Sequence, residues 1–348
     1  MRIALVAPPL LPVPPVRYGG VERIVGVLAQ GLVERGHDVT LFAPGDSGFN
    51  GKLVATVPQG LWNDGFKPDP GEQFLHSADV VLARADAFDV IHNHMDYYGF
   101  EMAEKSPVPV ISTLHGRTDD DPLGGEIRAH PKVALIAISD SQRSFVPEGN
   151  WIATIHHGLD FTGVEPGTGG GDYLAWVGRL SPDKGIAETV DLARRARIRL
   201  RVAAKVLDPR EQSMYDNVVA PAAAEGIVEF LGELDEKERD ALMGGALATV
   251  MLSNWPEPFG LVAIESLALG TPLIARRSGA LPEIVTNGID GFVVDDAAQG
   301  AEAVAHIAGL DRAQIRQRAL DRFSAARMLD DYEAVYRRAA EFAVHSDP

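Results

Sequence analysis

Cysteine is absent from this 348-residue chain. Its absence excludes disulfide bridges, cysteine nucleophiles, iron–sulfur clusters and thiolate zinc sites. Long hydrophobic runs are also missing, since no apolar stretch approaches the roughly 18 residues that a membrane-spanning helix needs. The first apolar run breaks at Pro8 and Pro9, and no small-residue cleavage site follows, so we interpret it as a buried strand and not as a signal peptide. We expect a soluble protein of the cytoplasm.

The chain also has fewer positively charged than negatively charged residues. The chain has 32 Lys and Arg against 49 Asp and Glu, a formal net charge of −17. This charge repels nucleic acid and anionic lipid over long range, so we expect no nucleic-acid partner and no strong membrane association. A local basic patch can outweigh the net charge, and we expect the densest one to form scattered surface ion pairs and not an anion site. It comprises Arg194, Arg195, Arg197, Arg199 and Arg201.

The chain otherwise has the composition of a folded protein, with 46% hydrophobic and 23% charged residues. Its length suits two domains at roughly 100–200 residues each. Short runs rich in Val, Ile and Leu alternate with helical or polar stretches, which predicts parallel strands and crossover helices. The strands predicted in the first half are Ile3–Ala7, Val39–Ala43, Val90–His92, Val110–Thr113, Ala134–Ile138 and Ile152–Ile155. Those predicted in the second half are Tyr173–Val177, Leu200–Ala204, Val228–Leu231, Ala248–Leu252, Pro272–Ala275 and Gly291–Val294.

Composition changes divide the chain into three segments. The run from Gly163 to Gly171 has the composition of a flexible linker, so we place one domain at residues 1–162 and a second at 172–322. In the third segment, 323–348, apolar side chains recur at helical spacing from Arg327 to Phe342. Ligands bind beyond the carboxyl ends of the strands in open α/β sheets. Two facing sheets would place a site in the cleft between them.

The stretch that begins at Glu257 combines helix signals with carboxylates. Pro258 suits the first turn of a helix, and Gly270 suits a carboxyl-terminal cap. These signals predict a short helix from just after Glu257 to near Leu269.

The amino end of this predicted helix would suit a diphosphate. Backbone N–H groups around Phe259, Gly260 and Leu261, together with the positive end of the helix dipole, attract anions. Glu257 would lie at that end and Glu265 two turns along, so one carboxylate could meet a sugar and the other a ribose. Taken without their surroundings, two glutamates at this spacing are more often a capping residue and a solvated helix position.

The surrounding pattern favours the functional interpretation. Two glutamates separated by seven residues, with Pro-Phe-Gly after the first, resemble the signature of glycosyltransferase family 4. These are retaining, nucleotide-sugar-dependent transferases of the GT-B fold, an α/β architecture of two facing Rossmann-like domains. Further motifs follow the family order over nearly the whole chain: Gly19–Arg23, Gly36–Val39, Asp89–His94, Val177–Gly185, Gly279–Val285 and Asp290–Val294.

The resemblance implies a role for each matching residue. Arg179 and Lys184 occupy the positions of the family's cationic pair on the donor diphosphate, where they would neutralise charge as the glycosidic bond breaks. His115 occupies the position of a histidine that contacts the donor sugar, and Glu257 and Glu265 would contact the sugar and the ribose. The helix that ends the chain would cross back to the first domain. We expect no metal or other cofactor.

The first domain offers further candidates. Gly19 and Gly20 precede a helix, so the backbone could approach phosphate or acceptor closely there. Asp96, Tyr97 and Tyr98 could line an acceptor pocket or form a packed aromatic cluster, and the sequence leaves both open.

Two further features limit what the sequence predicts. His92 and His94 alternate along a strand, so they should face opposite sides and hold no common metal. The run Ala203–Val206 stands where many family members have Gly-x-Gly near the base, so the nucleotide is uncertain between UDP, which is favoured, and GDP.

The implied reaction moves a sugar, a hexose by expectation, from a nucleotide sugar to a hydroxyl of a soluble small molecule or glycan. An epimerase, a sugar phosphorylase and a bilobed binding module remain alternatives. The oligomeric state stays open.

Overall fold

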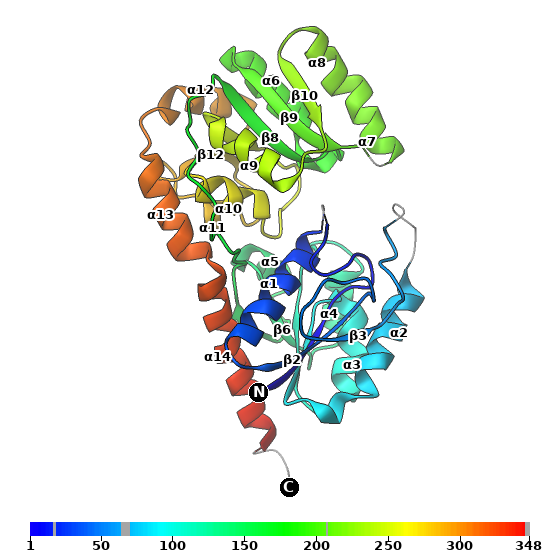
Figure 1. The fold of residues 1–348 in the computed structure, drawn as a ribbon. Coiled ribbons are helices and arrows are strands. Elements are labelled where there is room, and N and C mark those ends of the chain that lie inside the picture. Colours follow the sequence, from blue (N-terminus) through cyan, green and yellow to red (C-terminus); the bar gives the residue numbers. More distant parts are fainter. Residues whose placement is uncertain (17–18, 64–69, 207, 345–348) are drawn as a thin grey trace. The chain divides into compact units, whose positions relative to one another are not determined.

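The computed structural model describes residues 1–16, 19–63, 70–206 and 208–344, with side chains as far as residue 341 in the last helix. The chain divides into two compact units, unit 1 over Met1–Asp160 and Phe323–Pro348 and unit 2 over Phe161–Arg322. Figure 1 labels many of their helices and strands. No helix among the described residues is long and apolar enough to cross a membrane.

Unit 1 is built on a seven-stranded parallel sheet in the order β3-β2-β1-β4-β5-β6-β7. Its strands are β1 Arg2–Val6, β2 Asp38–Ala43, β3 Lys52–Ala55, β4 Val90–Asn93, β5 Val110–Thr113, β6 Ala134–Ala137 and β7 Trp151–Thr154. Its helices are α1 Gly20–Glu34, α2 Gly71–Leu82, α3 Phe100–Lys105, α4 Leu123–Ala129, α5 Asp140–Ser144 and α14 Ala325–Val344. All six predicted strands are present, and β3 is the strand that the sequence missed.

The missed strand β3 lies at the edge of this sheet. Both of its central residues are only half-buried and its two ends are exposed. An edge strand with one neighbour needs no continuous apolar run, so the pattern that revealed the other strands is absent from it.

The last helix, α14, packs on unit 1 as the family resemblance implied. It contacts α1 (Figure 1), where a methyl group added at Gly31 would overlap Leu329. Tyr332 and Tyr336 are fully buried, and the hydroxyl of Tyr336 lies 2.8 Å from His92 Nδ1 in β4. The side chain of Phe342 lies outside the described part.

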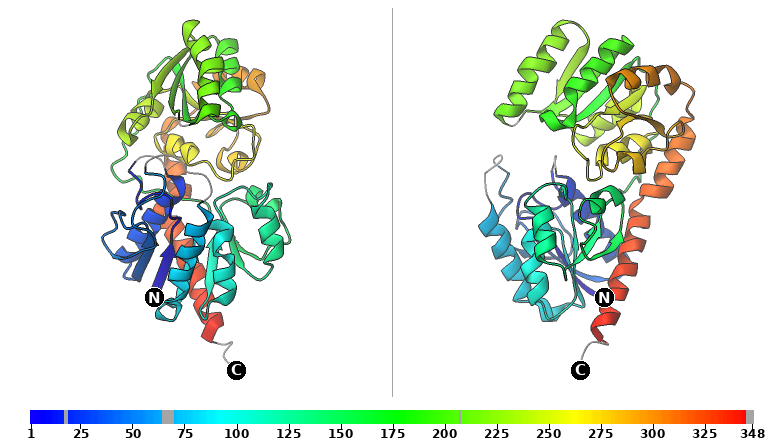
Figure 2. Two further views of the ribbon diagram at one scale, coloured as in Figure 1. Left: turned by 90° about the vertical axis from the view of Figure 1, so that its right-hand side faces the viewer. Right: turned by 180° about the vertical axis from the view of Figure 1, so that it is seen from behind.

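Unit 2 is a second Rossmann-like domain with a six-stranded parallel sheet in the order β10-β9-β8-β11-β12-β13. Its strands are β8 Tyr173–Arg179, β9 Arg199–Lys205, β10 Val228–Gly232, β11 Ala248–Met251, β12 Leu273–Arg276 and β13 Gly291–Val294. Its helices are α6 Ile186–Ala196, α7 Pro209–Met214, α8 Ala220–Ala224, α9 Glu236–Gly245, α10 Leu261–Ala268, α11 Leu281–Ile284, α12 Ala297–Ile307 and α13 Arg312–Phe323. Helices cover both faces of the sheet (Figure 2).

The glycine-rich run that suggested a flexible linker is packed against unit 2. The backbone N–H groups of Gly167, Gly169 and Gly171 donate to carbonyl groups of this unit at 2.8 to 2.9 Å. A Cβ atom at Gly167 would overlap the backbone of Gly244. Here glycine permits close packing of two backbones, a use that composition alone does not separate from flexibility.

Candidate functional site

The two predicted phosphate-binding cations lie at the carboxyl end of β8. Arg179 is the last residue of the strand, and Lys184 ends a short 3₁₀ turn over Pro182–Lys184. Ser181 is the N-cap residue of this turn, and its side chain makes no cap hydrogen bond to a described residue. The helix that follows, α6, begins at Ile186. Gly185, at φ 72°, separates the turn from the helix in a conformation that glycine adopts without strain.

Arg179 is held by a buried glutamate that the sequence analysis missed. Its Nε donates to Glu211 Oε1 at 2.8 Å; the Glu211 side chain has no exposed surface, whereas that of Arg179 is 40% exposed. Glu211 lies in α7, whose first turn is capped by the side chain of Asp208. The Asp-Pro start of α7 could have been predicted from the sequence, but the ion pair joins residues 32 positions apart and has no local signal.

Lys184 and Glu257 lie in contact, as expected for residues of one site. Lys184 Nζ donates to both carboxylate oxygens of Glu257, at 2.8 and 3.0 Å. Trp255 Nε1 donates to Oε2 of the same carboxylate at 2.9 Å, and Ser253 Oγ donates to it at 3.3 Å. Lys184 Nζ also lies 4.4 Å from the centroid of the Trp255 ring, within the range of a cation–π contact. The carboxylate therefore has three donors, and neither Trp255 nor Ser253 was among the sequence candidates.

The helix after Glu257 begins later than predicted. α10 starts at Leu261, so the prediction that Pro258 lies in its first turn is wrong. Gly260 is the N-cap at φ 99°, and no described side chain caps the helix. Phe259 is buried and anchors the segment of chain that precedes α10. The predicted end is confirmed, with Leu269 as C-cap. Uncapped N–H groups of a first turn, together with the positive helix end, favour a bound anion.

Glu265 lies on α10, away from the amino end of the helix. Its side chain is buried, and its Oε1 lies 3.8 Å from Arg239 Nη2 of α9. The structure therefore places the two carboxylates of the signature in different surroundings, with Glu257 beside Lys184 and Glu265 beside Arg239.

The candidates of unit 1 lie at the carboxyl ends of β1, β4 and β5, which are neighbours in the sheet. Gly19 is the N-cap of α1 at φ 151°, and Gly20 is its first residue. A Cβ atom at Gly19 would lie 2.8 Å from Pro15 and 3.0 Å from Glu22 Oε2. These close approaches require glycine at the position where the chain enters α1. Burial raises the pKa of the nearby Glu22 carboxyl to about 7.

His115 follows β5 and is held in three ways. Its backbone N–H donates to Asp96 Oδ1 at 2.7 Å, its Nε2 lies 2.9 Å from His94 Nδ1, and its ring stacks on that of His157 with centroids 5.2 Å apart. Burial lowers the pKa of His115 to about 3 and holds the pKa values of His94 and His157 well below their usual range. At neutral pH His115 is therefore an uncharged hydrogen-bonding group.

Asp96, Tyr97 and Tyr98 form part of the framework around His115. Asp96 adopts φ 46°, and burial raises its pKa to about 6 against the hydrogen bonds it accepts from backbone N–H groups. The ring of Tyr97 stacks on that of Tyr98, and Tyr98 stacks on Phe74, each with centroids 4.3 Å apart. The structure thus places the two tyrosines in an aromatic cluster, one of the two alternatives that the sequence left open.

The prediction that His92 and His94 face opposite sides is wrong. Residues two apart in a strand point to the same face, and the two ring centroids lie 3.9 Å apart. The Asn93 side chain accepts from the N–H of Met95 at 3.0 Å and donates to the carbonyl of Asp96 at 3.0 Å. These two hydrogen bonds hold the turn that follows β4. The described residues include no group of three or more His, Cys, Asp or Glu that could hold a metal ion.

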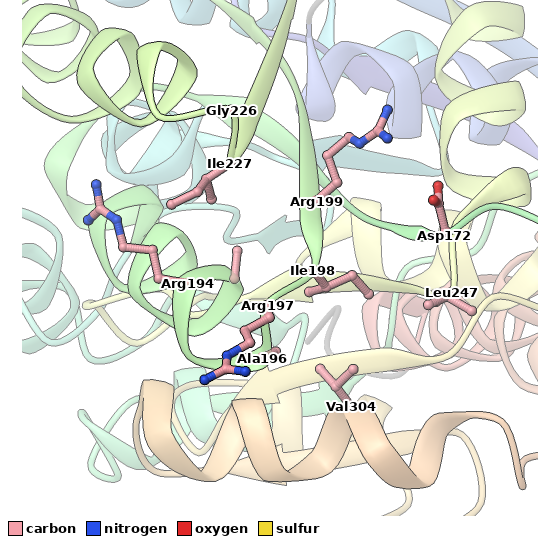
Figure 3. A pocket seen from close by; sticks show the side chains of 11 residues that line it. Asp172, Arg194, Ala196, Arg197, Ile198, Arg199, Gly226, Ile227, Leu247 and Val304 are labelled. Carbon is pink, nitrogen blue, oxygen red and sulfur yellow. The ribbon is translucent and has the colours of Figure 1, made fainter.

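The arginine-rich segment lies at the opposite end of the β8 and β9 strands from Arg179. As expected, three of its arginines form surface pairs, with Glu225, Asp191 and Glu229. Arg197 and Arg199 line an open cavity of about 710 Å³ with the apolar side chains of Ile198, Leu247 and Val304 (Figure 3). No predicted site residue lines this cavity.

Comparison with known proteins identifies the family. Residues 18–162 match the model of Glycosyltransferase Family 4 and residues 166–322 that of Glycosyl transferases group 1. Glycogen synthase of Mycobacterium tuberculosis is 30% identical over 331 residues, which span 80% of this chain and 79% of that protein.

Solved structures agree. AviGT4, a glycosyltransferase involved in avilamycin A biosynthesis, superposes with a TM-score of 0.74 at 26% identity, over 98% of both chains. HepE of Anabaena, crystallised with UDP and glucose, has a TM-score of 0.73 at 18% identity, over 96% of this chain and 99% of its own. With both halves matched in order and the two parallel sheets of the GT-B fold in place, this chain is a member of glycosyltransferase family 4 and acts as a hexosyltransferase.

Proposed function

We propose that this protein transfers a hexosyl group from UDP-hexose to a hydroxyl of a soluble small molecule or glycan, with retention of anomeric configuration. The observation that carries the proposal is the cluster of Lys184, Glu257 and Trp255 that precedes the uncapped end of α10. It combines a cation for phosphate, a carboxylate for sugar hydroxyls and backbone N–H groups for an anion.

Charge decides the roles within this cluster. The bond between the anomeric carbon and the diphosphate oxygen breaks, and negative charge grows on the leaving phosphate. Arg179, Lys184 and the N–H groups in the first turn of α10, which begins at Leu261, would stabilise that charge. Lys184 is paired with Glu257, so a bound diphosphate would compete with the carboxylate for the ammonium group.

The acceptor completes the reaction. Its hydroxyl oxygen forms the new bond to the anomeric carbon on the face that the diphosphate leaves, and its proton passes to the leaving phosphate oxygen. No covalent intermediate is needed. His115, uncharged at neutral pH, would hydrogen-bond to the donor sugar, and Glu265 would bind the ribose.

The choice of donor and acceptor rests on independent support. HepE, which shares the fold, has been crystallised with UDP and glucose, which favours a UDP-hexose over a GDP-hexose. The net charge of −17 opposes an acceptor embedded in an anionic membrane. The proposal includes neither a metal nor another cofactor, because the cations and the helix end can supply the positive charge. It also places the reaction in the cytoplasm; activity found only in a membrane fraction would contradict this.

The test is a panel of UDP-, GDP- and ADP-hexoses. We expect a UDP-hexose to raise the melting temperature most, to release UDP slowly without acceptor and to release it faster with acceptor. NMR of the product should show the donor's anomeric configuration. Epimerised donor would indicate an epimerase, turnover only with orthophosphate a phosphorylase, and binding without any UDP release a binding module.

A further inference from the structure

Unit 1 contains a cluster of four histidines, His92, His94, His115 and His157. All four are held uncharged, since burial lowers the pKa of each. His92, His94 and His157 are buried, whereas His115 is half-buried. The four rings lie in sequence, with centroid separations of 3.9, 5.2 and 5.2 Å. Such a cluster has a definite hydrogen-bond direction at each ring, because a neutral imidazole has one donor and one acceptor nitrogen.

His92 uses both nitrogens within the fold. Its Nε2 lies 2.7 Å from Thr113 Oγ1, and its Nδ1 lies 2.8 Å from the hydroxyl of Tyr336 in α14. Thr113 Oγ1 also lies 3.0 Å from the hydroxyl of Tyr332. This network secures α14 to β4 and β5, and it does not include the ring nitrogens of His115.

His94 differs from His92 because only one of its nitrogens has a partner. Its Nδ1 lies 2.9 Å from His115 Nε2, whereas its Nε2 is buried with no hydrogen-bond partner among the described residues. The bond between the two histidines requires one donor and one acceptor. If His115 donated, the proton of His94 would sit on Nε2 as a buried N–H without an acceptor. Since unpartnered buried N–H groups are rarer than unpartnered acceptors, His94 donates from Nδ1.

We infer that His94 is a positioning residue that fixes His115 in the tautomer with its proton on Nδ1. The sugar contact rests on the proposed function, whereas the tautomer does not. With Nε2 accepting from His94, the Nδ1–H of His115 is left to donate to a ligand, and no described residue hydrogen-bonds to it. The carboxylate of Asp96 accepts a hydrogen bond from the backbone N–H of His115. The ring of His157 stacks on the face of the His115 ring. The ring is therefore oriented to donate a hydrogen bond to a sugar hydroxyl oxygen, a role that the neutral tautomer with its proton on Nε2 would not reproduce.

Three substitutions of His94 separate hydrogen bonding from packing. The amide of Asn superposes on Nδ1 of histidine and that of Gln on Nε2, while Leu fills the space without a polar atom. We expect His94→Asn to keep the Nδ1–H tautomer of His115 and to retain activity within about threefold. His94→Gln and His94→Leu should lose the tautomer preference and lower kcat/KM with UDP-hexose on the order of tenfold or more, as loss of one directed hydrogen bond implies, with kcat falling more than KM rises.

The tautomer is measured directly, by nitrogen-15 NMR of the imidazole side chains in the protein without donor. Tyr336→Phe is the matched control. It removes the buried hydrogen bond between Tyr336 and His92, which is 2.8 Å long and so similar in length to the bond between His94 and His115. This variant should have a lower melting temperature and an unchanged His115 tautomer.

Three results would overturn the inference: a proton on Nε2 of His115 in the wild-type protein, an unchanged tautomer in His94→Leu, or His94→Asn as impaired as His94→Gln. If His94→Leu does not fold, the comparison of Asn with Gln still decides. Failure of the proposed function has a different signature, because the wild-type protein would then transfer no hexose while the NMR spectra still report the tautomer.

Discussion

Replacing Glu257 with Gln should strengthen nucleotide binding while it lowers turnover. Glu257 occupies Lys184 through both carboxylate oxygens, at 2.8 and 3.0 Å. Glutamine has the same shape and can still accept hydrogen bonds from Trp255 and Ser253, so the local fold should persist. It carries no charge, however, and therefore releases the ammonium group for a diphosphate.

The size of the effect follows from the ion pair. Lys184 is 26% exposed and Glu257 is 10% exposed, so the pair lies between the surface and buried limits. Exposed pairs contribute about 0.2–1 kcal/mol. If about 0.5–1 kcal/mol of this attraction no longer opposes the ligand, UDP should bind roughly two to five times more tightly. Turnover should fall on the order of 100-fold, because the sugar loses a charged partner in the transition state.

Calorimetry with UDP alone and steady-state kinetics with UDP-hexose measure the two effects separately. The matched control is Glu265→Gln, which removes the carboxylate assigned to the ribose and should weaken UDP binding instead. Melting temperatures of both variants should stay near that of the wild type. Weaker UDP binding by Glu257→Gln, to the same degree as by Glu265→Gln, would refute the division of roles between the two glutamates.

Three further outcomes follow from the structure. Lys184→Ala and Arg179→Ala should each lower kcat on the order of 100-fold with unchanged circular dichroism, and normal kinetics in either variant would remove that residue from the diphosphate site. Deleting the chain after Met328 removes the fully buried Tyr332 and Tyr336, so the melting temperature should fall strongly; an unaltered melting curve would show that α14 does not stabilise unit 1. The free energy of unfolding should decrease as the pH falls below about 6.5, by up to about 1.4 kcal/mol per pH unit for each buried neutral histidine, because the unfolded chain then binds more protons than the native chain. In urea titrations at pH 5 to 7, His157→Asn should flatten this slope, and an unchanged slope would contradict the lowered pKa.

Sequence periodicity predicted the strands well wherever they lie inside a sheet. The interior strand β5 begins and ends at the predicted residues, Val110 and Thr113, and all four of its residues are buried, as expected for a parallel strand with neighbours on both sides. The edge strand β3 escaped prediction because half of its surface remains in contact with solvent. The start of α10 was less predictable. Pro258 belongs to the segment that precedes the helix, and Gly260, in the left-handed region, is the N-cap.

Local sequence patterns could not predict which side chains of the candidate site pair with one another. Glu257 and Lys184 were both candidates, but the bonds between them join positions 73 residues apart. Glu211 resembles an ordinary surface glutamate in the sequence, and only the packing of α7 beside β8 buries it against Arg179. Burial of a charge is a property of the folded chain, and it is the feature that marks such a residue as a positioning group.

The error at His92 and His94 came from the use of strand periodicity, because residues two apart in a strand point to the same face and not to opposite faces. The N–H of His94 still donates to the carbonyl of Val6 in β1 at 2.9 Å, one residue beyond Asn93, where β4 ends. In a parallel α/β sheet, ligand-binding residues lie just past this point, at the carboxyl ends of the strands. There the strand period brings His94 beside His92, and the Asn93 side chain holds the turn that follows. Periodicity therefore locates the end of each strand and the face that its last residues share, whereas contacts between residues distant in the sequence, such as those of His115 with His94 and His157, decide which side chains meet there.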